Sequence, residues 1–484
     1  MTVLLIFLSL LFILVFILLL RTFAVSKGAP LPPYVAQERE NPLAAEKLAQ
    51  AIRFRTESFS DLGNIDLKGY EGFHHFLRQA FPLVHRHLQR QTISDYAVLY
   101  TWQGKDESLQ PVVLMAHWDV VPVAPAEEVR WTYPPYGGVL ADGYIHGRGS
   151  LDDKLSLISI FEAVETLLSQ AFQPERTVYL ALGGDEEIGG TLGAAATVRY
   201  LEERNIRPLW VLDEASVILQ GGLLGITRPL ALIGVAEKGH ADIMVIAQGR
   251  DGHASMPPAS TAVGILAKAV CRVEKRPSRI RLLPMVRRFL ENLAPHTSFA
   301  LKLVLSNLWL TGPLVGRILA KAPSSNSLVR TTRAFTVLQG SSAENILPEK
   351  AAAIANCRIL PGDSVQDTLT AIRKAVRDER VTVEVFRPED SGEPVPPSPL
   401  EGEGYKKITE TLSEVLPGVV PCPFLFNATT DSRYFSRICD TTIRFMPVIL
   451  QNEDLSLFHG TNERVSVRNL SQYVEFLVHL LRKT

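Results

Sequence analysis

Short apolar runs alternate with helical patterns through the first half of the chain. Residues 112–116 and 210–212 are apolar throughout, and residues 177–182 are apolar apart from Thr177. Residues 155–168 carry the apolar spacing of a helix. Strands that are apolar along their whole length, separated by helices, are typical of parallel strands covered on both faces. The pattern predicts an α/β domain with a mainly parallel mixed sheet covered by helices.

A different pattern begins near residue 238. Within residues 241–247, Ile243, Val245 and Ala247 occupy alternate positions, the spacing of one face of a strand. The segments that follow are a helix at 262–273, strands at 333–338 and 351–359, a helix at 365–377 and a strand at 381–386. This βαββαβ order predicts a small α+β domain inserted into the larger one. We therefore divide the chain into 41–237 and 391–484 for the larger domain and 238–390 for the insertion.

The N-terminus carries an almost unbroken apolar run, residues 2–20, that ends at Arg21. As a helix this run spans about 28 Å, close to the thickness of a bilayer core. It is longer than the apolar region of a signal peptide, and no basic residue precedes it. We expect residues 1–25 to form a transmembrane anchor and residues 26–40 a proline-rich linker, with a cleaved signal segment as the alternative.

The side of the membrane is less well determined. We expect the globular part to be extracytoplasmic, or secreted if the apolar segment is cleaved, whereas Arg21 and Lys27 favour a cytoplasmic flank by the positive-inside rule. Residues 279–330 are rich in apolar and basic side chains. They fit either a membrane-surface helix or lid over a lipid-like substrate, or ordinary packed helices.

Composition narrows the class of partner. The 484 residues have a net charge of −1, so no basic field favours nucleic acid, and a small-molecule substrate fits better. Length favours at least two domains. The four cysteines lack CxxC spacing, and we expect buried thiols, although pairing of Cys422 with Cys439 stays open.

Acidic and histidine side chains follow the predicted strands where each strand ends. His117, Glu186–Glu187 and Asp213 all occupy such positions, at the edge where open α/β sheets bind ligands. Asp152 lies in a glycine-rich turn before a helix, and His459 lies near the C-terminus. Imidazole and carboxylate groups are zinc ligands, and two zinc ions can share one carboxylate. Singly, each residue has an ordinary explanation, such as a helix cap for Asp152.

Two neighbours of these residues suit supporting roles. Asp119, two residues after His117, can accept the second ring N–H of the imidazole and so fix its tautomer. Adjacent acids such as Glu186 and Glu187 point in different directions, so one can bind metal while the other accepts a proton from water.

Six motifs carry a resemblance to a known family. They are Leu114-Met115-Ala116-His117, Gly147-Arg148-Gly149, Asp152-Asp153-Lys154, Ser306-Asn307-Leu308-Trp309-Leu310, Thr430-Asp431-Ser432-Arg433 and His459-Gly460. From about residue 40 onward the chain resembles the co-catalytic di-zinc metallopeptidases, which include aminoacylases and Gly-X carboxypeptidases. Its motifs are most similar to the branch that makes and hydrolyses N-fatty-acyl amino acids.

The resemblance implies roles for individual residues. One zinc would be held by His117, Asp152 and Asp213, the other by Asp152, Glu187 and His459, and Glu186 would be the general base. His253 would contact the oxyanion in the site of a partner subunit, which the inserted lid or dimerisation domain would allow it to reach. Asn345, Arg358 and Arg433 would contact the substrate.

We therefore expect a membrane-tethered zinc amidohydrolase that cleaves or forms the amide of N-acyl amino acids. The apolar 279–330 segment favours a long acyl chain. A Gly-X carboxypeptidase or dipeptidase is the alternative on the same site. A relative that has lost activity and only binds ligands is the third possibility, although the proposed base and ligands are all present.

Overall fold

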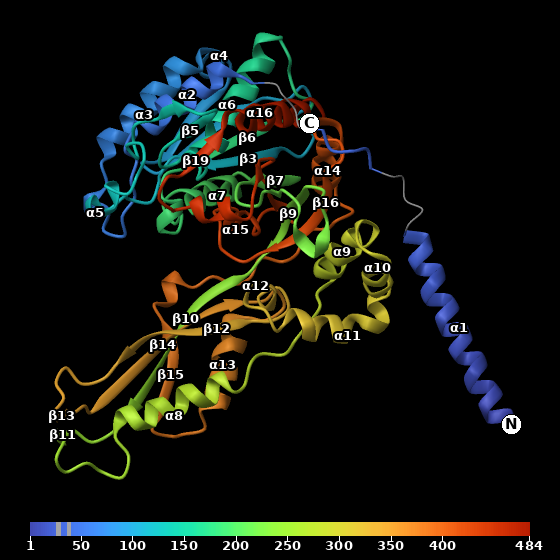
Figure 1. Ribbon diagram of the computed structural model, residues 1–484. Helices are drawn as coiled ribbons and strands as arrows, with labels where there is room; N and C mark the ends of the chain where they lie inside the picture. The colour runs from blue at the N-terminus through green and yellow to red at the C-terminus, as the bar shows by residue number, and fades with distance from the viewer. Residues whose placement is uncertain (26–30, 36–39) are drawn as a thin grey trace.

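The computed structural model describes residues 1–25, 31–35 and 40–484. Figure 1 shows two units built around separate sheets, with a group of short helices beside them and one long N-terminal helix projecting from the body. The two sheets meet where strand β9 (Leu230–Glu237) is followed by β10 (Gly239–Gln248). The long helix is α1 (Thr2–Val25).

The larger unit contains a ten-stranded mixed sheet, in the order β1-β2-β6-β3-β7-β17-β9-β8-β18, with β16 also paired to β9. Its central strands β6, β3, β7 and β17 run parallel, whereas β1, β2 and β8 pair antiparallel with their neighbours β2, β6 and β9. The strands besides β9 are β1 (Gln89–Ser94), β2 (Ala97–Trp102), β3 (Val112–His117), β6 (Val178–Gly183), β7 (Trp210–Asp213), β8 (Ile218–Leu219), β16 (Val420–Phe426), β17 (Thr442–Arg444) and β18 (Ile449–Leu450). The predicted α/β fold with a mixed sheet is confirmed, and the parallel part is its centre.

Helices cover both faces of this sheet, which explains why β3 is apolar along its length. Leu114 faces a core formed with α2 (Pro42–Ile52), α6 (Lys154–Ser169), α14 (Glu403–Val415) and α16 (Val467–Arg482). Val113 and Met115 face the opposite core with α7 (Ala194–Glu203) and α15 (Ser432–Phe435). Successive strand residues point to opposite faces, so both faces require apolar side chains.

The smaller unit is a four-stranded antiparallel sheet in the order β12-β14-β10-β15. Helices α8 (Ala262–Glu274) and α13 (Val365–Val376) pack against one face of it. The other strands are β12 (Thr332–Gln339), β14 (Lys350–Ile359) and β15 (Val381–Phe386). A two-stranded pair, β11 (Gly252–His253) and β13 (Ile346–Leu347), forms its outer tip (Figure 1). Its role as a lid or dimerisation unit stays a prediction.

The segment between α8 and β12 forms four helices. They are α9 (Pro284–Leu293), α10 (Phe299–Leu305), α11 (Leu308–Leu319) and α12 (Pro323–Asn326). Phe289, Leu290 and Leu293 of α9 form a core with Val420 and Cys422 of β16. Residues 279–330, which were noted for their basic and apolar side chains, are therefore largely helical and packed on the larger unit.

Helix α1 is the only helix of the described residues that is long and apolar enough to cross a membrane by itself. Part of the predicted linker, residues 26–30 and 36–39, lies outside the described residues. In the described part of the linker, the carbonyl oxygens of Leu31 and Pro32 accept hydrogen bonds from the Arg228 guanidinium. This part of the linker therefore contacts the larger unit.

All four cysteines are free thiols. Cys357, Cys422 and Cys439 are buried, as expected. The expectation was wrong for Cys271, which is exposed because it lies on the outer side of α8, away from the small sheet.

Candidate metal centre

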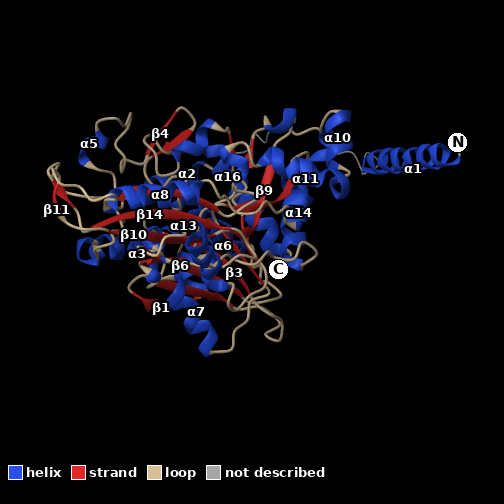
Figure 2. Cartoon of the chain, turned by 90° about the horizontal axis from the view of Figure 1, so that it is seen from below, coloured by secondary structure: helices blue, strands red, loops and turns tan. Residues whose placement is uncertain are grey.

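Four loops meet at one rim of the large sheet. His117 ends β3, and the short turn η2 (Glu186–Ile188) follows β6. Asp152 precedes α6, and His459 follows the turn η6 (Glu453–Leu457). Because β3 and β6 run parallel, their carboxyl ends bring these side chains to the same edge. Figure 2 shows the molecule from below, with all strands in red.

The first group of side chains that could hold a metal ion is His117, Asp152 and Glu214. The His117 Nε2 atom lies 3.1 Å from Asp152 Oδ1 and 3.5 Å from Glu214 Oε1. His117 and Glu214 are buried, while Asp152 is partly exposed. One imidazole nitrogen and two carboxylate oxygens form a donor set typical of zinc.

The second group is Asp152, Glu187 and His459. The His459 Nε2 atom lies 3.0 Å from Asp152 Oδ2 and 3.1 Å from Glu187 Oε2. The two oxygens of Asp152 therefore face different imidazoles, Oδ1 facing His117 and Oδ2 facing His459. This is the arrangement required of a carboxylate shared between two ions.

Asp213, expected as a ligand, belongs to neither group, whereas the adjacent Glu214 belongs to the first. The Asp213 Oδ2 atom accepts the backbone N–H of Ser432 at 2.9 Å. Consecutive residues at the end of an extended strand point in opposite directions. The Asp213 carboxylate thus holds the start of α15, while Glu214 faces His117.

Asp119 organises the site without joining either group. Its two carboxylate oxygens accept the backbone N–H groups of Glu186 and Glu187, at 3.2 and 3.1 Å. Its Oδ1 atom also lies 3.3 Å from Nδ1 of His117, which is 3.0 Å from the Asp119 carbonyl oxygen. A single buried carboxylate thus positions the turn of η2 and orients the imidazole ring.

The electrostatics of the cluster show an excess of negative charge. Burial and the nearby Asp152 charge raise the pKa of Glu187 to about 7. Burial, reinforced by the charge of Asp152, also holds the pKa of Glu214 well above its usual range. The hydrogen bonds to Asp152 and Glu187 raise the pKa of His459 to about 10. Crowded carboxylates favour bound cations, because cations remove the mutual repulsion.

A further observation fits a bound metal. Glu187 Oε1 is a buried oxygen without a hydrogen-bond partner among the described residues. A buried carboxylate oxygen without a donor is unfavourable unless a cation or a water satisfies it. The donor types and this unsatisfied oxygen therefore both suit a metal ion.

A buried ion pair joins two of the four loops. Arg148 Nη1 lies 2.6 Å from Glu463 Oε2, and Glu463 Oε1 accepts the backbone N–H of Leu151 at 2.7 Å and of Asp152 at 3.2 Å. Arg148 also donates to the carbonyl oxygen of His459 at 3.1 Å. The pair thereby connects the turn that carries one proposed ligand to the loop that carries another.

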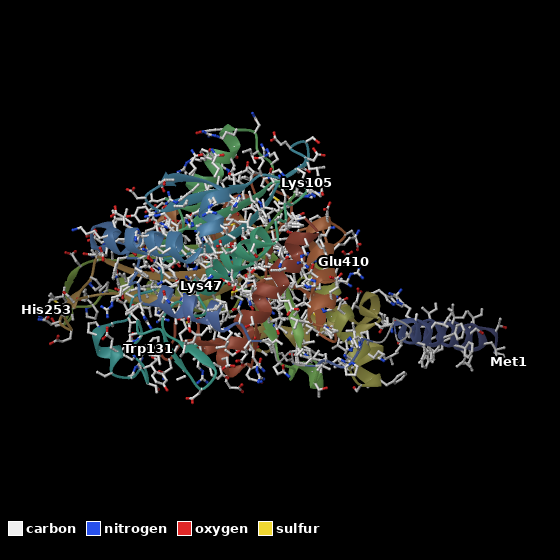
Figure 3. All side chains as sticks on the ribbon, turned by 90° about the horizontal axis from the view of Figure 1, so that it is seen from above. Met1, Lys47, Lys105, Trp131, His253 and Glu410 are labelled. Atoms are coloured by element: carbon white, nitrogen blue, oxygen red, sulfur yellow. The ribbon has the colours of Figure 1, made fainter. Side chains whose placement is uncertain are left out.

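The predicted residues of the small unit lie elsewhere. His253 and Asn345 are exposed at its tip, where the Asn345 carbonyl accepts the backbone N–H of Ala254 at 2.9 Å. Figure 3 shows His253 at the outer edge of the molecule. Arg358 lies on β14, opposite His240 of β10. The structure thus places His253 and Asn345 at the same tip but brings neither into the two donor groups.

Arg433, the remaining predicted substrate contact, lies beside the metal-binding turn. Its Nη2 atom donates to the carbonyl oxygen of Gly189 at 2.7 Å, directly after η2. Gly190, the next residue, has φ +65°, and a Cβ there would overlap the carboxylate of Asp431. The Thr430–Arg433 motif therefore supports the turn that bears Glu186 and Glu187.

Sequence reasoning missed Glu214, Arg148 and Glu463 as site residues. Glu214 stood next to the chosen Asp213, and Arg148 stood inside a quoted glycine motif, so a signal for both was visible. Glu463 carried no local signal, because its partners are more than 300 residues away in the sequence.

Comparison with known proteins defines the class. Residues 113–483 match the model of peptidase family M20/M25/M40. The N-fatty-acyl-amino acid synthase/hydrolase PM20D1 of Mus musculus is 38% identical over 468 residues, which cover 94% of this chain and 91% of that protein. The probable carboxypeptidase S-like 2 of Dictyostelium discoideum is 37% identical over 444 residues, covering 91% and 85%.

Solved structures agree on the fold. An M20 family metallo-carboxypeptidase from Sulfolobus solfataricus superimposes with a TM-score of 0.66 at 16% identity, covering 91% of this chain and 98% of the other. Human carnosine dipeptidase 1 gives 0.60 at 13% identity, covering 91% and 95%. The chain belongs to peptidase family M20, and the predicted family resemblance is confirmed. It is a metal-dependent hydrolase of the metallopeptidase and amidohydrolase class.

Proposed function

We propose that the protein is a two-zinc amidohydrolase that cleaves, or under mass action forms, the amide bond of N-acyl amino acids. The observation that supports this most directly is the carboxylate of Asp152 placed between two donor groups. The first ion would be held by His117, Asp152 and Glu214, and the second by Asp152, Glu187 and His459. Bound zinc would lower the pKa of a water molecule toward neutrality.

Glu186 is the proposed general base. It lies beside the ligand Glu187, and its backbone N–H is held by Asp119. Burial, with the charge of Glu214 adding to it, holds its pKa well above the usual range. The carboxylate would accept a proton from the attacking water and pass it to the amine leaving group. Arg358 is the proposed partner of the substrate carboxylate, because a guanidinium can bind it with two hydrogen bonds.

The test of the base is Glu186→Gln. We expect amide hydrolysis to fall by about two to four orders of magnitude, the usual contribution of a general base. Zinc content should stay at the wild-type value, because Glu186 belongs to neither donor group. Glu203→Gln on the exposed end of α7 is the matched control. Unchanged turnover in Glu186→Gln would remove the role of this residue.

We further propose that the acyl group is a fatty acyl chain. The support is the 36–38% identity to proteins named N-fatty-acyl-amino acid synthase/hydrolase, over more than nine-tenths of this chain. Hydrolysis of N-oleoyl-phenylalanine should exceed that of N-acetyl-phenylalanine and of Gly-X dipeptides. Equal or better turnover of the short substrates would eliminate the fatty-acyl assignment but not the amidohydrolase.

Carboxypeptidase activity is the second candidate. It is favoured by the 37% identity to a probable carboxypeptidase S-like protein. Both reactions need a carboxylate next to the amide that breaks, so both would use the same proposed ligands and base. Preferential release of the C-terminal amino acid from blocked dipeptides would support this candidate.

The proposed location is a membrane, with α1 as an uncleaved anchor. Its 24 residues and its apolar surface suit a bilayer. Retention of the N-terminal segment in the mature protein, together with resistance of the membrane-bound form to alkaline extraction, would support the anchor. A mature protein that begins after residue 25 would show a secreted form instead.

A further inference from the structure

The outer face of α11 is apolar although no part of the described chain covers it. Trp309, Leu310, Leu314 and Ile318 lie on this face, with 46–57% of each side chain exposed. The opposite face, which includes Leu308 and Val315, is buried. Helices at a protein–water boundary normally carry polar residues on the outer side. A helix that is apolar on both sides requires a second apolar environment.

Helix α1 is docked at the start of α11. Buried Asn307, the N-cap residue of α11, donates its side-chain N–H to the Leu18 carbonyl oxygen at 3.2 Å and to the Thr22 hydroxyl at 3.3 Å. The ring of Phe23 contacts that of Phe299 on α10, with centroids 6.0 Å apart. The exposed face of α11 is therefore continuous with the last turns of the proposed membrane anchor.

The orientation of these helices suits a membrane surface. α10 and α11 are bent by 104° at Ser306 and Asn307. In Figure 1, the C-terminal end of α1 lies beside α10, and the helix extends downward from there, away from the larger unit. Helices α11 and α8 lie on the same lower side of the body. A bilayer crossed by α1 would therefore meet the side of the body that carries α11.

The charges around the apolar face point to the same environment. Arg317 and Lys321 occupy the exposed side of the last turn of α11 and the residues after it. Basic side chains beside an apolar helical face are typical of helices that lie in the headgroup region, with a tryptophan at the boundary.

We propose that the outer face of α10 and α11 is a bilayer contact, with α11 lying in the membrane interface beside α1. Phe299, Trp309, Leu310, Leu314 and Ile318 would enter the boundary between headgroups and acyl chains. This contact goes beyond the proposed reaction and does not depend on it. It would fix the body against the membrane at two points, the anchor and the interfacial helix, so the body would have one orientation.

The test uses tryptophan fluorescence of the full-length chain in phosphatidylcholine nanodiscs. The chain has five tryptophans, of which Trp102, Trp118 and Trp210 are buried. Lipid brominated near the headgroup should quench the emission of Trp309, obtained as the difference between wild type and Trp309→Phe. Bromine at the acyl-chain end should quench it less, because an interfacial helix is shallow.

A second variant tests the face without removing the probe. This variant combines Leu310→Glu, Leu314→Glu and Ile318→Glu. It should reduce the quenching of Trp309 by brominated lipid by more than about half, because charged side chains leave the apolar region. The exposed leucines Leu62 and Leu140 provide the matched control, Leu62→Glu with Leu140→Glu. The thermal unfolding temperature should stay unchanged, because the three side chains point outward.

Two outcomes would overturn the bilayer contact. In the first, acrylamide in water quenches Trp309 fully while brominated lipid has no effect, which means that water covers the face. In the second, brominated lipid again has no effect and the triple substitution converts a dimer into a monomer, which means that a second copy covers it. Neither result would alter the measured amide hydrolysis, so failure here is separable from failure of the proposed function.

Discussion

Neighbouring residues have different chemical roles at this metal centre because the backbone points them in different directions. Asp213 and Glu214 are adjacent, yet one carboxylate holds the N–H of Ser432 and the other faces His117. The sequence predicted an acidic ligand at the end of this strand, where both Asp213 and Glu214 lie. It could not choose between the two acids, because the choice depends on which side of the strand end faces His117.

Substitution of the two acids should separate their roles. Glu214→Gln is expected to reduce bound zinc from two ions to about one per chain, since the first donor group loses one of three side chains. Asp213→Asn should keep both ions, because the amide oxygen of asparagine can still accept the Ser432 N–H. Metal analysis after dialysis measures both. The opposite pattern would restore Asp213 as the ligand.

Lys238 is a second residue whose surroundings determine its chemistry. It is buried at the junction of β9 and β10, and its Nζ atom donates to the carbonyl oxygens of Ser327 and Arg330, each at 3.0 Å. Burial, together with the charge of Arg358, lowers its pKa to about 7. In the unfolded chain the pKa would be near its ordinary value of 10.5.

This difference predicts a pH dependence of stability. Between pH 7 and 10.5 the unfolded chain holds more protons at Lys238 than the folded chain, so the free energy of unfolding rises with pH. The rise attributable to this group is up to about 1.4 kcal/mol per pH unit. Lys238→Met should remove that part of the slope, whereas exposed Lys406→Met should leave it. Denaturant unfolding at pH 7, 8 and 9 tests this, and equal slopes in all three proteins would contradict it.

At the scale of elements, most helices and strands could be predicted because their patterns are local. The helix expected at 155–168 is α6, and the strand expected at 351–359 is β14. The strands that pair antiparallel at the sheet edges were not separated from the parallel ones. An apolar run shows that a strand is buried, whereas its direction depends on pairing with distant residues.

The connection between loops was also not predictable. Arg148 and Glu463 are separated by more than 300 residues, and nothing near Glu463 marks it as part of the site. In the folded chain this carboxylate holds the guanidinium and the N–H groups of Leu151 and Asp152. The first and last parts of the larger unit are thus joined directly under the proposed bridging ligand.

Glu463→Gln should therefore weaken metal binding although Glu463 is not a ligand. Loss of a residue that orients ligands typically lowers metal affinity by about 10–100-fold. Leaving Arg148 buried without its charged partner should also lower the free energy of unfolding by about 3–5 kcal/mol. Chelator competition and thermal unfolding measure the two effects. In the control, Glu403→Gln removes a pair with Arg176 in which the glutamate is exposed, and it should change stability by less than about 1 kcal/mol.

At the scale of the whole molecule, the two sheets place predicted site residues far apart. The metal-binding groups lie on the rim of the larger sheet, while His253 and Asn345 are exposed at the tip of the smaller unit (Figures 1 and 3). The sequence indicated both sets but gave no distance between them, because that distance depends on how one unit is joined to the other.

The family resemblance implies that His253, which is exposed at the outer tip, acts in the site of a second copy of the chain. If His253 completes the site of a partner subunit, two inactive variants should restore activity when they form mixed dimers. Glu186→Gln loses the proposed base, and His253→Ala loses the proposed oxyanion contact. A mixed dimer contains one site with an intact Glu186 and a His253 supplied by the other subunit. Its second site lacks both groups.

Refolding or co-expressing the two variants in equal amounts should therefore yield about a quarter of wild-type activity, since half of randomly formed dimers are mixed and each has one intact site. Each variant alone should stay near its own low value. Met256→Ala is the control, because Met256 is exposed in the same loop as His253. This variant should be active by itself, without a second variant. Activity of the mixture equal to the mean of the two variants would show that His253 acts within its own chain or not at all.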